Sequence, residues 1–197
     1  MMTRKLMTVL IPGLFVLSSL ATAQQTFSVK PLVEKKVTEL PSGDLFWRIE
    51  TFDSKEKAQT AAGPLGLVAE FEGKVWLFEL GHAGQASKGG KKVAEIGPLP
   101  RVNAEQYLLR INEAGGPPGS VTQVHTHPGS EAFYVLAGEL TQKTPQGVAR
   151  VSAGQTMVGH AGDVPMEVSS SGSAELKEFA LFVVDATKPF SSPAKLN

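Results

Sequence analysis

The stretch GSVTQVHTHPGSEAFYVLAG, residues 119–138, carries the pattern that decides the fold. His125 and His127 are two residues apart in a segment of extended character, where alternate side chains point to the same face. Pro128-Gly129 predicts a turn, and Glu131 begins the next extended segment. We expect this hairpin to bring two imidazoles and one carboxylate together.

Two neutral imidazoles and a carboxylate are a ligand set for a divalent metal of intermediate hardness. Three protein ligands also leave coordination positions open for water or a substrate, as catalytic metal sites require. The segment therefore predicts one divalent metal ion (Mn, Fe, Zn, Ni or Co) held by His125, His127 and Glu131. Apart from this metal, no nucleophile with a neighbouring base stands out, and the catalytic residues stay unassigned.

The same stretch resembles the first motif of the cupin superfamily, in which a glycine is followed by two histidines, a glutamate and a second glycine. The five motif positions are occupied, at the spacing of that family, by Gly119, His125, His127, Glu131 and Gly138. The resemblance covers about residues 105–186. It implies an all-β fold, a cupin-type jelly-roll barrel, which here would carry a short N-terminal helix and a strand extension.

The second cupin motif, which usually supplies another histidine ligand, is incomplete in residues 147–170. In one alignment Gly162 is the motif glycine and Pro165 takes the histidine position. In the other, which keeps the following strand in phase and which we prefer, Met166 takes that position. A thioether is a weak ligand for these metals and a common core filler, so we expect a core role for Met166, with a fourth-ligand role as the alternative. His160 is a further candidate, from a loop.

The pattern around this stretch predicts a β-sandwich or barrel independently of the resemblance, because short apolar strands alternate with Gly, Pro and Ser turns. The expected strands are 44–52, 67–71, 74–80, 107–112, 121–126, 131–137, 139–144, 148–151, 155–158, 164–169 and 175–184. A helix over 54–62 is predicted by the capping-box spacing of Asp53 and Glu56 and by the stop at Gly63-Pro64.

Residues 1–23 have the three parts of a secretory signal peptide. Arg4-Lys5 precedes the apolar stretch 6–20, and Ala21-Thr22-Ala23 is a typical cleavage site. The apolar stretch is short for a membrane span of about 20 residues, which favours cleavage after Ala23 over a retained anchor. We expect a periplasmic or secreted protein with no membrane attachment after cleavage.

We divide the chain into five parts. They are the signal peptide 1–23, a loose N-terminal arm 24–40, an N-terminal elaboration of the barrel 41–104, the cupin barrel 105–190 and a tail 191–197 that packs little.

The composition excludes several classes of protein and of site. The 197 residues are 42% hydrophobic with a formal net charge of zero, which excludes disorder for the bulk of the chain and gives no case for a nucleic-acid partner. The absence of cysteine excludes disulfides, thiolate metal sites and a cysteine nucleophile.

We expect an exported cupin that binds a small oxygen-donor molecule at its metal. A divalent cation beside one carboxylate leaves net positive charge, which favours an anionic or enolisable ligand. Dioxygenase, isomerase and lyase chemistry all suit such a site. The alternative, favoured by the incomplete second motif, is a non-catalytic small-molecule-binding or structural cupin with weak or no metal. Because cupins commonly pair through their sheets, the resemblance also implies a homodimer.

Overall fold

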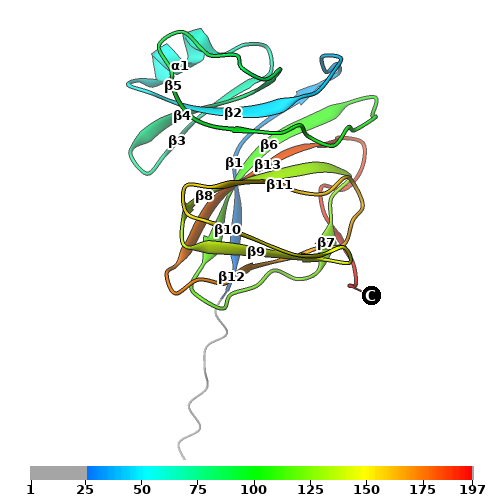
Figure 1. The fold of residues 1–197 in the computed structure, drawn as a ribbon. Helices are drawn as coiled ribbons and strands as arrows, with labels where there is room; N and C mark the ends of the chain where they lie inside the picture. Colours follow the sequence, from blue (N-terminus) through cyan, green and yellow to red (C-terminus); the bar gives the residue numbers. More distant parts are fainter. Residues whose placement is uncertain (1–25, 197) are drawn as a thin grey trace, which may run out of the picture.

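The structure is a computed structural model that describes residues 26–196, most of which form strands (Figure 1). The expected signal peptide, residues 1–23, lies outside this part of the chain. In chain order the elements are β1 (Ser28–Val37), β2 (Phe46–Phe52), α1 (Lys55–Ala61), β3 (Gly66–Phe71), β4 (Lys74–Gly81), β5 (Lys91–Ile96), β6 (Tyr107–Gly116), β7 (His125–Thr126), β8 (Gly129–Ala137), β9 (Glu139–Thr144), β10 (Gly147–Ser152), β11 (Thr156–Val158), β12 (Glu167–Ser170), β13 (Leu176–Asp185) and β14 (Ser192–Pro193).

Two sheets face each other in the lower half of Figure 1 and form the jelly roll. One has five strands in the order β1-β6-β13-β8-β11, and the other has three in the order β10-β9-β12. A two-stranded sheet, β14-β7, lies beside them. The expectation of an all-β jelly roll is confirmed. Across residues 26–196 the strands form separate sheets, however, and none of these sheets closes on itself into a barrel.

The central strands of the five-stranded sheet are buried on both faces, and this explains the unbroken apolar run 179–184 of β13. Phe182 and Val184 point into the core between the two jelly-roll sheets, together with Phe133 and Leu140. The β13 residues that alternate with these, Phe179, Leu181 and Val183, point to the opposite side of the sheet. A strand covered on both faces reads as continuously apolar because neither set of alternating side chains meets water.

The N-terminal elaboration forms a second layer over that opposite side. Its four strands, in the order β3-β4-β2-β5, make one antiparallel sheet. The ring of Phe179 lies 5.0 Å, centroid to centroid, from the rings of both Trp76 and Phe78 on β4. Trp47 is fully buried in the same core. Both tryptophans are therefore core residues.

Helix α1 closes one side of this layer. Ser54 is its N-cap, with its hydroxyl accepting from the backbone N–H of Lys57 at 3.3 Å. The helix position is as predicted, but the expected cap is shifted by one residue, because the carboxylate of Asp53 pairs with the ammonium of Lys57 instead. Across residues 26–196, no helix has both the length and the apolar character needed to cross a membrane.

Two segments expected to be loose are ordered strands. Residues 28–37, within the predicted N-terminal arm, form β1 and pair along their length with β6. In the predicted tail, β14 pairs with β7, and the N–H of Ala194 donates to the carbonyl of Val124 at 3.0 Å. The tail therefore packs against the segment that carries the histidines.

The two glycines that bound the HxHxxxE segment are required by the backbone. Gly119 has φ of +84° and Gly138 has φ of +75°, values that side chains with a Cβ rarely adopt. At Gly138 a Cβ would also lie 2.7 Å from the carbonyl oxygen of Glu175. These glycines allow the chain to enter β7 and to turn from β8 into β9.

Candidate functional site

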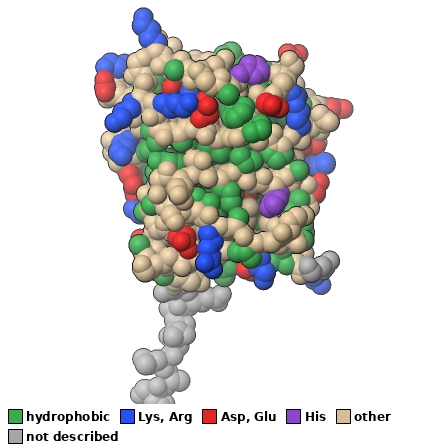
Figure 2. Space-filling model, in the orientation of Figure 1, with side chains coloured by type: hydrophobic (Ala, Val, Ile, Leu, Met, Phe, Trp, Pro, Cys, Tyr) green, Lys and Arg blue, Asp and Glu red, His purple; other side chains and the backbone are tan. Residues whose placement is uncertain are grey.

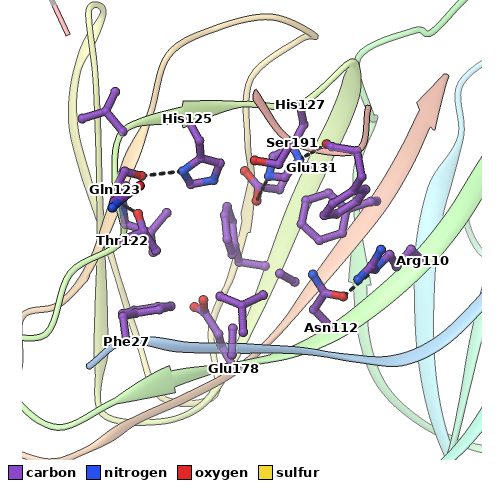
Figure 3. Close-up of a pocket in the computed structure, with 18 of the residues that line it drawn as sticks. Phe27, Arg110, Asn112, Thr122, Gln123, His125, His127, Glu131, Glu178 and Ser191 are labelled. Atoms are coloured by element: carbon purple, nitrogen blue, oxygen red, sulfur yellow. Dashed lines mark hydrogen bonds and ion pairs between the residues drawn. The ribbon is translucent and has the colours of Figure 1, made fainter. Parts of the chain in front are cut away.

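A cavity of about 510 Å³ opens between the jelly-roll sheets. Its wall is mainly apolar and includes Phe27, Phe133 and Phe182. His125, His127 and Glu131 lie together at one end of it (Figure 3). On the outer surface, hydrophobic side chains cross the middle of the face shown in Figure 2, and charged side chains lie mainly towards its edges.

The three predicted ligands are brought together by strand pairings other than the expected hairpin. β7 and β8 do not pair as a hairpin; β7 pairs with β14, and β8 pairs with β13 and β11. The Pro128-Gly129 segment instead carries the chain from the small sheet into the large one. Gly129 fits there because a Cβ would lie 2.3 Å from the carbonyl oxygen of Val183 on the neighbouring strand β13.

His125 is held by hydrogen bonds of its backbone and its ring. Its N–H and C=O exchange hydrogen bonds with Met166, at 3.0 and 2.8 Å. Its Nδ1 lies 2.7 Å from the carbonyl oxygen of Gln123. A carbonyl can only accept, so Nδ1 carries the proton, and in the neutral ring Nε2 keeps a free lone pair.

His127 is oriented in the same way but is more deeply buried. Its Nδ1 donates to the carbonyl oxygen of Phe190 at 2.6 Å, and its ring packs against the rings of Phe182 and Phe190. Burial disfavours the imidazolium and lowers the pKa of His127 to about 4. The ring is therefore neutral at pH 7, with Nε2 available as a ligand.

Glu131 is the first inward-facing residue of β8 beside the histidines. Its Oε1 lies 3.9 Å from Nε2 of His127, and its Oε2 accepts from Nε2 of Gln142 at 3.3 Å. Burial raises the pKa of this carboxyl to about 8 because no cation offsets the cost of removing the charge from water.

The donor atoms are of the types that bind a divalent metal, although they lie farther apart than the ligands of a bound metal ion. Within residues 26–196, no three His, Asp or Glu side chains are grouped closely enough to hold a metal ion. The rings of His125 and His127 lie 4.9 Å apart between centroids. Tetrahedral ligands at ordinary bond lengths are about 3.4 Å apart, so the 3.9 Å between His127 and Glu131 is too long by about half an ångström.

The two remaining candidates for a fourth ligand, Met166 and His160, have different surroundings. Met166 is buried, and its sulfur accepts from Nε2 of Gln142 at 3.4 Å, the same amide that contacts Glu131. Its pairing opposite His125 supports the alignment that gives it the histidine position. His160 contacts the hydroxyl of Thr144 at 3.4 Å. Neither His160 nor Met166 is among the residues that line the cavity.

Two residues in the cavity wall were missed by the sequence analysis. Asn112 on β6 and Glu178 on β13 are 1% and 2% exposed, and both face the cavity. Burial, and then the nearby carboxyl of Glu131, raise the pKa of Glu178 well above its ordinary value. The available signal was Glu178 itself, an acidic residue directly before the apolar run 179–184.

Fold and site together define a jelly-roll protein with a His/Glu pocket. Residues 116–184 match the family model of the cupin domain. This part of the chain is thus a cupin domain, as the first motif predicted. A comparison with curated proteins gave no match.

Several solved structures share part of the fold. A conserved protein of unknown function from Streptococcus pyogenes is 23% identical, with a TM-score of 0.35, over 39% of this chain and 64% of its own. A cupin-like protein from Thermotoga maritima is 15% identical, with a TM-score of 0.40, over 45% and 65%. A DMSP lyase from Ruegeria pomeroyi is 18% identical, with a TM-score of 0.38, over 44% and 43%. The match spans less than two thirds of each of these chains, and at this level it does not bear on activity.

Proposed function

We propose that this protein is an exported cupin that binds one divalent metal ion through His125, His127 and Glu131, and beside it a small molecule with oxygen donors. The observation that carries the proposal is the matched orientation of the two imidazoles. Each Nδ1 donates to a backbone carbonyl, so in the neutral form of each ring Nε2 is the nitrogen that can bind a metal. Metal-bound histidines are typically oriented by such a hydrogen bond on the other ring nitrogen.

The burial of Glu131 gives independent support. Its carboxyl group is 3% exposed and is contacted by a neutral amide and a neutral imidazole, so its charge has no cationic partner. A bound divalent cation would supply that charge. When bound, such a metal acts as a Lewis acid that orients and polarises an oxygen donor of the ligand.

The reaction classes that suit this pocket are dioxygenase, isomerase and lyase chemistry. The second candidate is a non-catalytic cupin that binds a small molecule with weak or no metal. Two observations favour it: the residue paired with His125 is Met166, a thioether and not an imidazole, and the donors are wider apart than in a closed site.

Metal titration tests the proposal. Calorimetric titration of the purified protein with Mn, Fe, Zn, Ni and Co should show one site per chain. Replacing His125 or His127 by Ala should reduce affinity at least about 100-fold while circular dichroism stays unchanged. His160→Ala is the matched control and should bind normally. Stoichiometric binding that survives the double replacement of His125 and His127 would refute the ligand assignment.

Export and pairing belong to the same proposal. The first 23 residues support cleavage after Ala23, and the intact mass of protein recovered from the periplasm or medium would then begin at Gln24. A soluble product that keeps residues 1–23 would contradict export. Homodimer formation, which the cupin domain implies, is measured by light scattering of the purified protein.

A further inference from the structure

Two buried polar atoms in the cavity wall have no hydrogen-bond partner in the protein. They are Nδ2 of Asn112 and Oε2 of Glu178. Both residues are almost fully buried and both line the cavity that contains the proposed metal ligands. Because a buried polar atom without a partner is costly, a pair of them facing one cavity indicates that something else hydrogen-bonds there.

The strand register places these two side chains next to each other. On the paired strands β6 and β13, Asn112 is opposite Ala180, and Glu178 is opposite Ala114. Asn112 and Glu178 are therefore diagonal neighbours on the same face of the sheet, within reach of one small group. Figure 3 shows both on the side of the cavity away from His125 and His127.

The amide of Asn112 has a fixed orientation. Its Oδ1 accepts from Nε of Arg110 at 2.9 Å. That guanidinium is itself held over the ring of Phe190, 4.2 Å from its centroid, and lies 3.5 Å from the carboxylate of Glu34. Nδ2 is the atom of Asn112 left without a partner, so Asn112 offers N–H donors to the cavity.

We propose that Asn112 and Glu178 form a second recognition subsite, which binds a hydroxyl or carboxamide group of the small molecule. Asn112 donates to that group, and the carboxyl of Glu178 hydrogen-bonds to it as well. A hydroxyl or a carboxamide can both accept and donate, so either satisfies the two side chains at once. A carboxylate is disfavoured, because burying its charge against a mainly apolar wall is costly.

This inference rests on the proposed function for the end of the ligand near the histidines. The two sites together define the chemical class of the ligand. The molecule has oxygen donors at the end near His125 and His127. Its middle is apolar, to match Phe133 and Phe182. At its far end it carries a neutral hydroxyl or amide. A cavity of about 510 Å³ is within the range of small-molecule sites.

Single-group fragments test the subsite without the metal. Benzyl alcohol, benzamide, toluene and benzoate share a ring and differ in the group offered to Asn112 and Glu178. Their affinities for metal-free, chelator-treated full chain are measured by ligand-observed NMR. We expect the alcohol and the amide to bind about tenfold more tightly than toluene and benzoate, the value of roughly one net hydrogen bond. Equal affinities, a preference for toluene or benzoate, or no binding of any fragment would overturn the proposal.

Variants then assign the selectivity to these residues. Glu178→Leu and Asn112→Leu should each remove the preference for alcohol over toluene, whereas Phe133→Leu should weaken all four fragments alike. Retained selectivity in both folded Leu variants would overturn the assignment. The comparison in unmodified protein needs no variant, so a variant that fails to fold does not affect it. A crystal soaked with benzyl alcohol should place its hydroxyl on both side chains; water there, with the alcohol elsewhere, would also overturn it.

The two proposals fail separately. Fragment selectivity without any metal binding would keep the subsite and refute the metal site. Normal metal titration without fragment selectivity would keep the metal site and refute the subsite.

Discussion

Gln142 connects the two sides of the proposed metal site. Its amide donates to Oε2 of Glu131 and to the sulfur of Met166, and so holds the carboxylate beside His127. Gln142→Leu should lower metal affinity about tenfold, because it removes the group that orients a ligand without removing the ligand. Affinity is measured by calorimetric titration with Zn or Mn.

The control for this prediction is Gln123→Ala. His125 is hydrogen-bonded to the backbone carbonyl of Gln123, which the substitution keeps, so metal affinity should stay as in the unmodified protein. Equal losses in both variants would mean that the effect is a general disturbance of the pocket.

The buried titratable groups predict a stability maximum in mildly acidic solution for the metal-free protein. The pKa of Glu131 rises from 4.5 to about 8, so the folded state keeps a proton that the unfolded chain loses, and stability falls as pH rises through this window. The pKa of His127 falls from 6.5 to about 4, so stability falls as pH drops through that window. Burial also raises the pKa of Glu178, so a second carboxyl adds to the loss of stability with rising pH. The two carboxyls outweigh the histidine, and stability should be highest at roughly pH 4–5.

Urea unfolding of chelator-treated protein from pH 4 to pH 9 measures this profile. One group changes stability by at most about 1.4 kcal/mol per pH unit. Glu131→Gln should make the alkaline side less steep, and the slope that remains comes from Glu178. An alkaline slope as steep as that of the unmodified protein would show that Glu131 does not contribute to it.

At the scale of elements, the C-terminal segment completes the pocket. β14 pairs with β7, and both Ser191 and Pro193 line the cavity. Deleting residues 191–197 should leave circular dichroism nearly unchanged but weaken metal binding several-fold, because β7 loses the strand that fixes His125. The matched control deletes 195–197 only, beyond the bond from Ala194 to Val124. Identical affinities of the two truncated chains would exclude a role for β14.

Local patterns predicted most elements but not those that depend on distant partners. The capping residues of α1 and the alternation of Glu131 and Phe133 are local signals, and both led to correct elements. β1, with the sequence SVKPLVEKKV, has no such signal because it is an exposed, charged strand at a sheet edge. It forms because β6, some 75 residues later in the chain, offers a free side.

The candidate site shows the same limit. His125, His127 and Glu131 were found because their spacing alone specifies a shared face. Asn112 and Glu178 come from strands that pair across more than 60 residues, and no spacing rule connects them. A polar residue inside a doubly buried strand was the one available clue.

At the scale of the molecule, the N-terminal sheet and the jelly roll share one core. Phe179 is fully buried among Trp76, Phe78 and Phe71. Phe179→Ala should cost about 3–5 kcal/mol of unfolding free energy, whereas exposed Val148→Ala should cost little. Both tryptophans lie in the N-terminal sheet, so their fluorescence should follow the same urea transition as circular dichroism of the whole chain. Two separate transitions would show that residues 41–104 fold independently.

The central position of β13 has a consequence for the order in which the protein can be made. β13 ends at Asp185, near the end of the chain, yet it lies between β6 and β8 in the large sheet. Until the ribosome has released it, β6 and β8 each lack a neighbour, and the chain exposes two open strand edges. Contacts this distant in sequence also make folding slow. The nascent chain should therefore stay unfolded until β13 has left the ribosome, and should need protection from aggregation until then.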